Sequence, residues 1–324
     1  MTILLNLSYN TVFGEELVVN LVKGDNPMDV VQQKMSTLNG SEWTCRVNTP
    51  EGMDIISYFY SVEKNGVLSR QEWQLQPHIL RLSASKSESF VVYDHWNDIP
   101  EDAYMYSSAI TDCVAKRAKS KPVKTTSTQA IVIKTKAPQL RSTERLAIMG
   151  EGKAFGEWES TKALQMEEFA PNEWMAVIDA KKVKGNRLEF KFVALDEKID
   201  YTPLWETRNN RTIDLPELKA GESVVYELDT AFFPIFAWKA AGVVVPIFSL
   251  RSEGSFGVGD FGDLKMMVDW AAKTNQRVIQ ILPIYDTTIT NTWTDSYPYN
   301  SISIYALHPQ YADLRQLPEL KDAE

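Results

Sequence analysis

The stretch that decides the fold of the C-terminal part of the chain is Val243-Val244-Val245-Pro246-Ile247-Phe248-Ser249-Leu250. It is almost continuously apolar, and such runs are typical of parallel strands that are buried on both faces. A second run of this kind covers residues 278–284. Between the two runs, a helix is expected to begin near Gly262, with Asp263 as its N-cap. The order strand, helix, strand predicts a βαβ unit with parallel strands.

One face of the predicted helix is apolar. Its residues are Leu264, Met267, Val268, Ala271 and Ala272, which follow at helical spacing. A βαβ unit cannot bury both faces without further strands, and the roughly 40 residues that follow are too few for a doubly wound sheet or a barrel. We therefore expect residues 231–324 to open a larger α/β domain that continues beyond Glu324.

The composition indicates an ordinary soluble protein, with 44% hydrophobic and 24% charged residues among 324. The net charge of -9 argues against a nucleic-acid partner, because phosphate contacts need clustered Lys and Arg. The start, Met1–Leu7, lacks the basic region of a signal peptide and predicts a first strand. No apolar stretch is long enough to cross a membrane, and we expect no membrane partner. We expect a cytoplasmic protein because its two cysteines indicate free thiols in a reducing cytoplasm.

The few cysteines and histidines argue against disulfides and metals. Cys45 and Cys113 have no CxxC spacing, which indicates free thiols in a reducing compartment. Three histidines in the whole chain argue against a His-based metal site. We expect no cofactor.

The first two thirds of the chain contain an internal repeat, in which residues 1–100 match residues 130–230. Five pairs of anchors carry the match: Gly24-Asp25-Asn26 with Gly156-Glu157-Trp158 (156 − 24 = 132), Glu42-Trp43 with Glu173-Trp174 (173 − 42 = 131), Tyr58-Phe59-Tyr60 with Phe190-Lys191-Phe192 (190 − 58 = 132), Trp73 with Trp205 (205 − 73 = 132), and Val91-Val92-Tyr93 with Val224-Val225-Tyr226 (224 − 91 = 133). Five matches in nearly one register are hard to obtain by chance.

Each copy consists of short alternating apolar segments, such as Leu188–Val193, separated by turn residues. This pattern is typical of an antiparallel β-sandwich. The stretch 116–129 is basic, polar and without periodicity, which indicates a linker. The sequence thus predicts a first sandwich at 1–115, a linker at 116–129, a second sandwich at 130–230 and the βαβ unit at 231–324.

Three stretches of the second copy are Phe155–Trp158, Leu188–Val193, and Trp205-Glu206 followed by Asn210-Arg211. On these motifs the copy resembles an immunoglobulin-like starch-binding module of carbohydrate-binding family 20. In that family two tryptophans form a platform for an α-glucan, helped by a lysine and an asparagine. The resemblance places these roles on Trp158, Trp205, Lys191 and Asn210.

The chemistry of these residue types suits a sugar. A pyranose ring has an apolar C–H face that lies well on an indole, and polar groups at the rim fix its register. A single tryptophan is more often a core residue, and Trp174, inside an alternating strand, is expected in the core. Trp158 and Trp205 together with their polar neighbours favour binding.

The first copy departs from this pattern. Asn26 stands at the first platform position, Phe59 replaces the lysine and His78 falls at the asparagine position, whereas Trp73 is kept. One aromatic face without partners predicts weak sugar binding or none. We expect a degenerate module.

Six motifs stand out in the C-terminal part: Pro246–Arg251, Gly257–Leu264, Gln280–Ile284, Ser296–Ser301, Ala306–Pro309 and Tyr311–Leu314. On these motifs this part resembles the start of the 4-alpha-glucanotransferases called amylomaltases or disproportionating enzymes, glycoside hydrolase family 77. The family fold is a (β/α)8 barrel, whose active site lies at the C-terminal ends of the strands. The resemblance implies transfer of α-1,4-glucan segments between maltooligosaccharides, starch or glycogen.

The resemblance also implies substrate-binding residues in the loop after the second strand. Tyr299 matches the family tyrosine that packs against the sugar at the cleavage site, and Ser296 and Asn300 flank it. The family reaction is retaining and covalent, and it uses an aspartate nucleophile, a glutamate acid–base and a second aspartate. None of the three can be placed in this sequence, and by family position they lie beyond Glu324. For the acids that are present, we expect capping or loop hydrogen bonds; these are Asp263, Asp286 and Asp295.

Two other interpretations stay open. The segment Gly257-Val258-Gly259-Asp260-Phe261-Gly262 fits GxGxxG between a strand and a helix, the signature of a dinucleotide-dependent oxidoreductase. Against it, Asp260 places negative charge where pyrophosphate would lie. The second alternative is a starch- or glycogen-binding protein without activity, which is what we expect of the 324 residues on their own.

Overall fold

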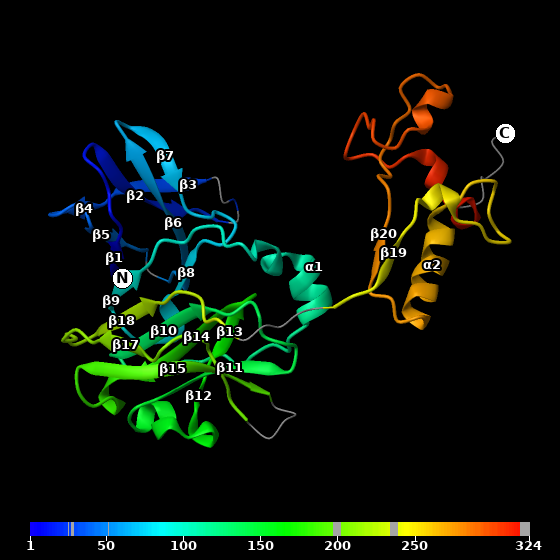
Figure 1. Ribbon diagram of the computed structural model, residues 1–324. Helices are drawn as coiled ribbons and strands as arrows, with labels where there is room; N and C mark the ends of the chain where they lie inside the picture. Colours follow the sequence, from blue (N-terminus) through cyan, green and yellow to red (C-terminus); the bar gives the residue numbers. More distant parts are fainter. Residues whose placement is uncertain (25, 27–28, 51, 197–201, 234–238, 318–324) are drawn as a thin grey trace. The chain divides into compact units, whose positions relative to one another are not determined.

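Figure 1 shows the computed structural model of the chain. It describes residues 1–24, 26, 29–50, 52–196, 202–233 and 239–317. The chain divides into two compact units, Met1–Phe236 and Ala237–Glu324, and each is described by itself.

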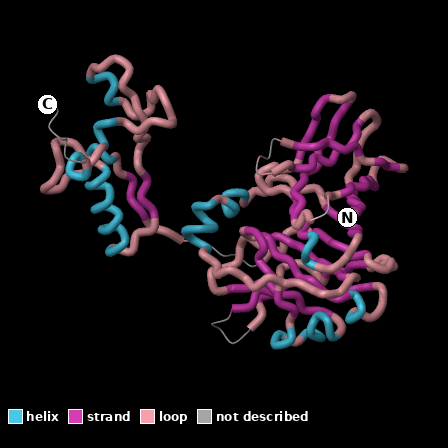
Figure 2. The backbone as a smooth tube through the Cα atoms, turned by 180° about the vertical axis from the view of Figure 1, so that it is seen from behind, coloured by secondary structure: helices cyan, strands magenta, loops and turns pink. Residues whose placement is uncertain are grey.

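The first unit is built from strands, as the tube view in Figure 2 makes plain. Its described residues form an eight-stranded sheet in the order β13-β14-β10-β18-β9-β1-β5-β4. The bounds are β1 Thr2–Ser8, β4 Ser36–Thr37, β5 Glu42–Asn48, β9 Ser89–Asp94, β10 Ala130–Lys136, β13 Glu167–Ala170, β14 Glu173–Asp179 and β18 Glu222–Glu227. The strands of the first repeat make one half of this sheet, and those of the second repeat make the other half.

Each repeat adds a smaller sheet of its own. In the first repeat it contains β2 Glu15–Val22, β3 Val30–Lys34, β6 Ile55–Lys64, β7 Val67–Gln71 and β8 His78–Arg81. In the second repeat it contains β11 Glu144–Gly150, β12 Leu164–Gln165, β15 Arg187–Asp196, β16 Leu204–Trp205 and β17 Arg211–Asp214. Both small sheets pack on the large one through apolar side chains, so each repeat is a sandwich, as predicted.

The two sandwiches share their central strands. Every residue of β10 is buried, because its alternate side chains serve two cores. Ile131 and Ile133 belong to the core of the second repeat, whereas Val132 lies in the core of the first. Val225 of β18 likewise packs into the first core. The two repeats therefore bury apolar surface against each other as well as within themselves.

The shared sheet is mixed, whereas the sequence pattern predicts antiparallel sandwiches. Strand β9 pairs in parallel with both β1 and β18, and β10 pairs in parallel with β18. The β9–β18 register places each residue opposite its repeat equivalent, for example Tyr93 opposite Tyr226 (226 − 93 = 133). Their rings stack, with centroids 5.1 Å apart. Strands β9 and β18 are equivalent edge strands of the two copies. If one copy is rotated onto the other about an axis parallel to these strands, the strand direction does not change, so the two edges pair in parallel.

The stretch 116–129 contains no helix or strand, but it is held in place. The Arg117 side chain donates to the Glu168 carboxylate and is almost completely buried. The Val123 N–H donates to Glu167 at 2.7 Å. Before this stretch lie the short helix α1 Ser108–Ile110 and a π-helical turn, Thr111–Ala115.

The second unit contains a strand–helix–strand arrangement. Strands β19 Gly242–Val244 and β20 Val278–Gln280 pair in parallel, and helix α2 Phe261–Lys273 lies between them in sequence. The order and the parallel pairing agree with the prediction, but both strands are shorter than the apolar runs suggested. Pro246 follows β19, and Ile247–Ser249 is a 3-10 turn. The Val244 side chain is 66% exposed, so this unit does not bury both faces of the strand pair.

Helix α2 begins earlier than predicted. Asp260, not Asp263, is its N-cap, and the two residues form a capping box in which each carboxylate accepts the other's backbone N–H. The sequence pattern placed the cap at the acid nearest the apolar stripe and missed the reciprocal pair three residues apart. Of the predicted apolar face, Ala271 is buried and Leu264 and Met267 are half-buried, whereas Val268 and Ala272 are exposed.

The described residues also contain short 3-10 helices at Leu82–Ala84, Ala103–Tyr106, Lys153–Trp158, Ser160–Lys162, Ala180–Lys182, Trp293–Ser296, Pro309–Tyr311 and Leu314–Gln316. Cys45 and Cys113 are both free thiols, as expected. No helix within the described part of the chain has the length and apolar character needed to span a bilayer.

Candidate functional site

The small sheet of the second repeat turns one face outward, and the predicted platform residues lie on that face. Along β15, Phe190, Phe192 and Ala194 point into the core. Because side chains alternate across a strand, Lys191 and Val193 point the other way. Trp205 of β16 lies directly opposite Val193, so its indole shares the outer face and is 37% exposed.

Trp158 reaches the same face from a tight turn. It ends the 3-10 segment Lys153–Trp158, in which Gly156, Glu157 and Trp158 all have positive φ. At Gly156 a Cβ would collide with the backbone carbonyl of Lys162, so only glycine fits. The Trp158 indole packs on a small apolar patch of the outer face, made of Ala147, Met149, Val193 and Leu195.

The structure brings the two predicted indoles together. The ring centroids of Trp158 and Trp205 are 6.3 Å apart, and the ring planes are inclined by 38°. Both rings are partly exposed and come from separate elements. Two adjacent, inclined apolar faces can each take one sugar ring of a chain whose successive rings turn relative to one another.

The polar residues of the predicted site lie around the rings. Lys191 is half-buried on the outer face, opposite Met149. Asn210 is exposed, and its Nδ2 donates to Glu189 Oε1 at 2.8 Å. Glu189 shares the outer face with Lys191, two residues away on β15. The sequence analysis missed Glu189, although its alternation with Lys191 could have placed it there.

A buried ion pair holds the segment that carries Trp205 and Asn210. Glu206 is 1% exposed and accepts from the Phe192 N–H and from the Arg211 guanidinium. Arg211 also pairs with Asp229 and lies over the Phe192 ring. Burial lowers the pKa of Arg211, but its bonds to Glu206 outweigh this and raise it, so the arginine stays charged. The pair anchors residues 205–211 to β15.

A groove of about 900 Å³ continues the outer face. Ala163 and Leu195 line it and also belong to the patch beneath Trp158. Its other wall is the stretch 119–124, which supplies three lysines. Sequence reasoning placed no site there, because it treated this stretch only as a connection.

Trp174 is 0% exposed in the core of the second repeat, as predicted.

The first repeat lacks the platform more completely than the sequence alignment suggested. Gln71 lies opposite Ser61 as Trp205 lies opposite Val193 (193 − 61 = 132), so Gln71 occupies the second platform position. Trp73, which the sequence alignment matched with Trp205, lies two residues further along the chain. Its ring packs edge to face against that of Tyr106, with the ring centroids 5.3 Å apart. The segment that connects the two paired strands differs in length between the copies, so the sequence alignment at constant offset matched Trp73 with Trp205 incorrectly.

The same comparison corrects the position of His78. It lies opposite Tyr58 as Arg211 lies opposite Phe190, so His78 corresponds to Arg211 and not to Asn210. Asn26 is among the described residues, but its neighbours 25, 27 and 28 lie outside them.

In the second unit, the loop after β20 exposes the predicted substrate-binding residues. The Tyr299 ring is 60% exposed and lies 5.5 Å from that of Tyr297. Ser296 and Asn300 are exposed, and the Ser296 hydroxyl donates to the Trp293 carbonyl at 2.7 Å. A bridge between Tyr285 and Leu307 closes the base of the loop.

The acids of this unit make the hydrogen bonds expected of caps and turns. Asp286 accepts from the N–H and hydroxyl of Thr288, and Asp295 accepts from the N–H groups of Thr290 and Asn291. Asp263 accepts from two serine hydroxyls in addition to the capping N–H. The α2 N-terminus is thus occupied by its own carboxylates, which leaves no place for a dinucleotide pyrophosphate.

Two family models match parts of the chain. Residues 128–225 match the model described as a starch binding domain, and residues 245–324 match the model described as 4-alpha-glucanotransferase. Both resemblances inferred from the motifs are confirmed.

Curated relatives carry the same description. The 4-alpha-glucanotransferase DPE2 of Oryza sativa subsp. japonica is 28% identical over 338 residues, which cover 98% of this chain and 35% of the relative. The 4-alpha-glucanotransferase of Chlamydia caviae is 43% identical over 88 residues, which cover 25% of this chain and 16% of the relative. This chain therefore spans about a third of the rice relative and less than a fifth of the chlamydial one.

A solved structure of the family 20 module of a maltotetraose-forming amylase from Pseudomonas saccharophila is also similar. It is 14% identical and covers 31% of this chain and 99% of that chain, with a TM-score of 0.25.

Proposed function

We propose that this protein is a 4-alpha-glucanotransferase that carries its own starch-binding module. It transfers α-1,4-glucan segments between maltooligosaccharides, starch or glycogen. The observation that carries the proposal is that one chain joins a pair of exposed indoles on a starch-binding domain to a segment of the 4-alpha-glucanotransferase family.

Trp158 and Trp205 bind the glucan, Lys191 hydrogen-bonds its hydroxyl groups, and Asn210, oriented by Glu189, does the same at the rim. The first repeat contributes no platform. A glucan longer than the two rings continues into the groove beside Ala163 and Leu195. In this proposal residues 1–115 are the first sandwich, 116–129 the linker, 130–230 the starch-binding sandwich and 231–324 the start of the glucanotransferase barrel.

The transfer chemistry belongs to a (β/α)8 barrel of which β19, α2 and β20 form the first βαβ unit. Tyr299 packs against the sugar at the cleavage site, and Ser296 and Asn300 hold the same loop. A retaining mechanism needs a nucleophilic carboxylate and a second carboxyl group about 5–5.5 Å apart. Asp263, Asp286 and Asp295 do not supply them, because their oxygens are engaged in caps and turns. We place the protein in the cytoplasm, where Cys45 and Cys113 stay reduced.

Incubation with maltotriose tests the activity. Transfer yields glucose together with oligosaccharides longer than maltotriose, whereas hydrolysis yields no longer products. The natural protein is expected to give the transfer pattern, and the 324-residue chain alone is expected to give no turnover. Turnover by the chain alone would place catalytic acids within these residues.

The alternative is a glucan-binding protein without activity. The buried ion pair that supports the platform would serve that function equally well. Glucan binding by the natural protein with no turnover of maltotriose would favour this alternative.

A further inference from the structure

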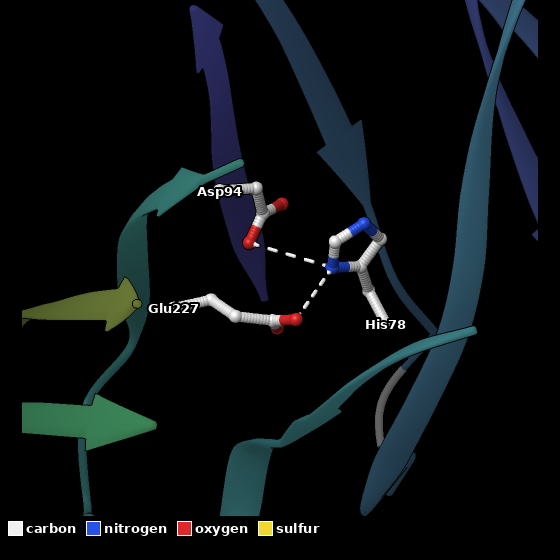
Figure 3. Close-up of side chains that lie close together, drawn as sticks. All are labelled: His78, Asp94 and Glu227. Carbon is white, nitrogen blue, oxygen red and sulfur yellow. Dashed lines mark ion pairs between the residues drawn. The ribbon is translucent and has the colours of Figure 1, made fainter. Parts of the chain in front are cut away.

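Three side chains meet between the two repeats, shielded from solvent (Figure 3). His78 begins β8, Asp94 ends β9 and Glu227 ends β18. One nitrogen or oxygen of each lies within 4.8 Å of those of the other two. We call these residues the inter-repeat cluster. Its members come from both copies of the repeat, and Asp94 and Glu227 are equivalent positions (227 − 94 = 133).

Two of the atoms that face each other have no hydrogen-bond partner among the described residues: His78 Nδ1 and Asp94 Oδ1. They are 4.0 Å apart, and both side chains are 0% exposed. Nδ1 also lies 3.0 Å from Glu227 Oε1, so a protonated imidazole would form an ion pair with that carboxylate, whereas a neutral one leaves Nδ1 and Oε1 as two ligand atoms. Native structures rarely leave buried polar atoms unpaired. Two such atoms beside a third ligand atom indicate that a partner binds between them.

The outward atoms of the cluster are all held. His78 Nε2 lies 3.1 Å from both oxygens of Glu72. Histidines that bind metals commonly donate their second N–H to a carboxylate in this way, which fixes the tautomer and leaves Nδ1 free as a ligand.

The two carboxylates are oriented in the same manner. The hydroxyls of Tyr58 and Tyr60 donate to Asp94 Oδ2 at 2.8 and 2.7 Å, and Lys134 Nζ donates to Glu227 Oε2 at 2.5 Å. Each carboxylate thereby turns its second oxygen toward His78. Ligating carboxylates are typically hydrogen-bonded through such outer partners.

The charges around the cluster leave room for a dication. Four buried carboxylates act on one another here, those of Glu72, Asp94, Glu173 and Glu227, together with two buried lysines, Lys134 and Lys136. Burial lowers the pKa of His78, but the carboxylates of Glu227, Glu72 and Asp94 outweigh it and raise this pKa, so a metal ion has to displace a proton from the imidazole. With His78 deprotonated as a ligand, the sum of these charges is −4 + 2 = −2. An uncompensated buried charge is strongly unfavourable. One divalent cation brings the sum to zero.

In the second repeat an arginine neutralises the corresponding buried carboxylate. Glu206 accepts the Phe192 N–H as Glu72 accepts that of Tyr60, and Arg211 neutralises Glu206 from the position that corresponds to His78. A guanidinium cannot bind a metal, whereas a neutral imidazole can. The first repeat has a metal-capable ring where its copy has a fixed cation.

We propose that the inter-repeat cluster binds one divalent transition-metal ion of the zinc type through His78 Nδ1, Asp94 Oδ1 and Glu227 Oε1. Imidazole with carboxylates suits zinc better than calcium or magnesium. Metal–ligand bonds of about 2.0–2.2 Å in tetrahedral geometry put ligand atoms about 3.3–3.6 Å apart. The two distances from His78 Nδ1 are 3.0 and 4.0 Å, on either side of this spacing, and all three ligand atoms lie within 4.8 Å of one another. Because the ligands come from both repeats, the ion stabilises the shared sheet.

Metal content and thermal unfolding of the full 324-residue chain test the proposal. The chain is stripped with a chelator, supplied with Zn²⁺, separated from free metal by gel filtration and analysed by mass spectrometry of the elements. We expect one zinc per chain and a Tm that rises with Zn²⁺ and falls again with chelator. Less than about a tenth of an equivalent, with a Tm indifferent to Zn²⁺ and chelator, would overturn the proposal; His78 would then be a charged counterpart of Arg211.

Three variants locate the site. Asp94→Asn keeps the shape but removes the carboxylate and is expected to weaken zinc binding at least a hundredfold. Glu72→Gln alters only the outer partner of His78 and is expected to weaken it by about 10–100-fold. Asp98→Asn, a change at an exposed acid four residues from Asp94, is the control and should bind as the unaltered chain does. Undiminished binding in folded Asp94→Asn would place the metal elsewhere and contradict the proposal. If Asp94→Asn does not fold, the metal content and Tm of the unaltered chain still decide.

Discussion

Whether a tryptophan is available to bind a glucan depends on the face of the strand to which its side chain points. Trp174 and Trp205 are both aromatic residues of strands in the second repeat, yet one is buried and the other is partly exposed on the outer face. The outer position of Trp205 follows from its pairing with Val193, since β15 turns its odd-numbered residues outward. Trp73 has no such position.

Replacement of Trp205 by alanine is expected to weaken glucan binding by about 1–3 kcal/mol, because it removes one of two stacking faces. Calorimetric titration of the chain with a cyclodextrin measures the loss. Trp73→Ala is the matched control and should leave the affinity unchanged, since Gln71 occupies its expected place. Equal losses in both variants would remove the basis of the platform assignment.

Glu189 is expected to act through Asn210 and not by contact with the indoles. Glu189→Gln keeps the acceptor oxygen but loses the charge-assisted bond, which is worth about 1 kcal/mol more than a neutral one. The cyclodextrin affinity should therefore fall less in Glu189→Gln than in Glu189→Ala, and Glu189→Ala should resemble Asn210→Ala. A Glu189→Ala variant with unchanged affinity would show that Asn210 needs no orientation.

At the scale of elements, the short turn that ends at Trp158 determines where the Trp158 indole lies. Three successive residues of this turn have positive φ, which places the indole over the apolar patch on β11 and β15. The α2 N-terminus shows a second local arrangement, in which Asp260 and Asp263 accept each other's backbone N–H and two serine hydroxyls donate to the Asp263 carboxylate.

Gly156→Ala is expected to destabilise the chain by more than about 1 kcal/mol and to weaken glucan binding, because the added methyl collides with the Lys162 carbonyl. Gly152→Ala is the control. Gly152 also has a positive φ, but its Cβ would meet nothing within 4 Å, so only the backbone strain is added. Urea unfolding and cyclodextrin titration compare the two variants. Similar binding in both would mean that this turn does not set the position of Trp158.

The capping of α2 should depend on pH. Burial raises the pKa of Asp263, but hydrogen bonds from Ser252, Ser255 and the Asp260 N–H outweigh it and hold the pKa below its usual 3.8. A carboxyl with a lowered folded pKa stabilises above its unfolded pKa, and this contribution is lost as pH falls through the folded pKa. The hydrogen-exchange protection at the start of α2, relative to the unfolded chain at the same pH, should decrease below pH 3.8, and in Asp263→Asn that acid dependence should be absent. An unaltered dependence in Asp263→Asn would assign it to another group.

Across the first unit as a whole, the eight-stranded sheet is expected to make the two repeats unfold as one cooperative structure. Val132 and Val225 of the second repeat lie in the first core, and β9 and β18 pair residue by residue. A loss of packing in one copy is therefore expected to lower the stability of the other copy as well.

Val225→Ala is expected to cost about 1–3 kcal/mol and to lower the protection of β1 and β10 together, because Val225 is 1% exposed in the shared core. Hydrogen exchange of the full chain, read strand by strand, is the measurement. Val12→Ala, at an exposed position, should change neither strand. Reduced protection confined to β10 would show that the repeats unfold separately.

Much of this architecture follows from local pattern. Alternating apolar residues predict the sandwiches, the constant offset predicts two copies, and the strand–helix–strand order predicts the parallel pair of the second unit. Motifs in short segments carry the resemblance to both families, because a residue type at a given spacing needs no tertiary information. The apolar run Val243–Leu250 predicts a longer strand than β19, since Pro246 ends the pairing that apolarity alone would extend.

What the sequence by itself determined is therefore the content of each part: two related sandwiches, a pair of candidate indoles and a segment that resembles the start of the 4-alpha-glucanotransferases. Tertiary structure alone decided which residues meet. It set the register that gives Gln71, and not Trp73, the place of Trp205, and the parallel edge pairing of β9 with β18. It also brought His78 between Asp94 and Glu227. Pairing across more than a hundred residues depends on how two cores exclude water against each other, and no spacing along one chain encodes that.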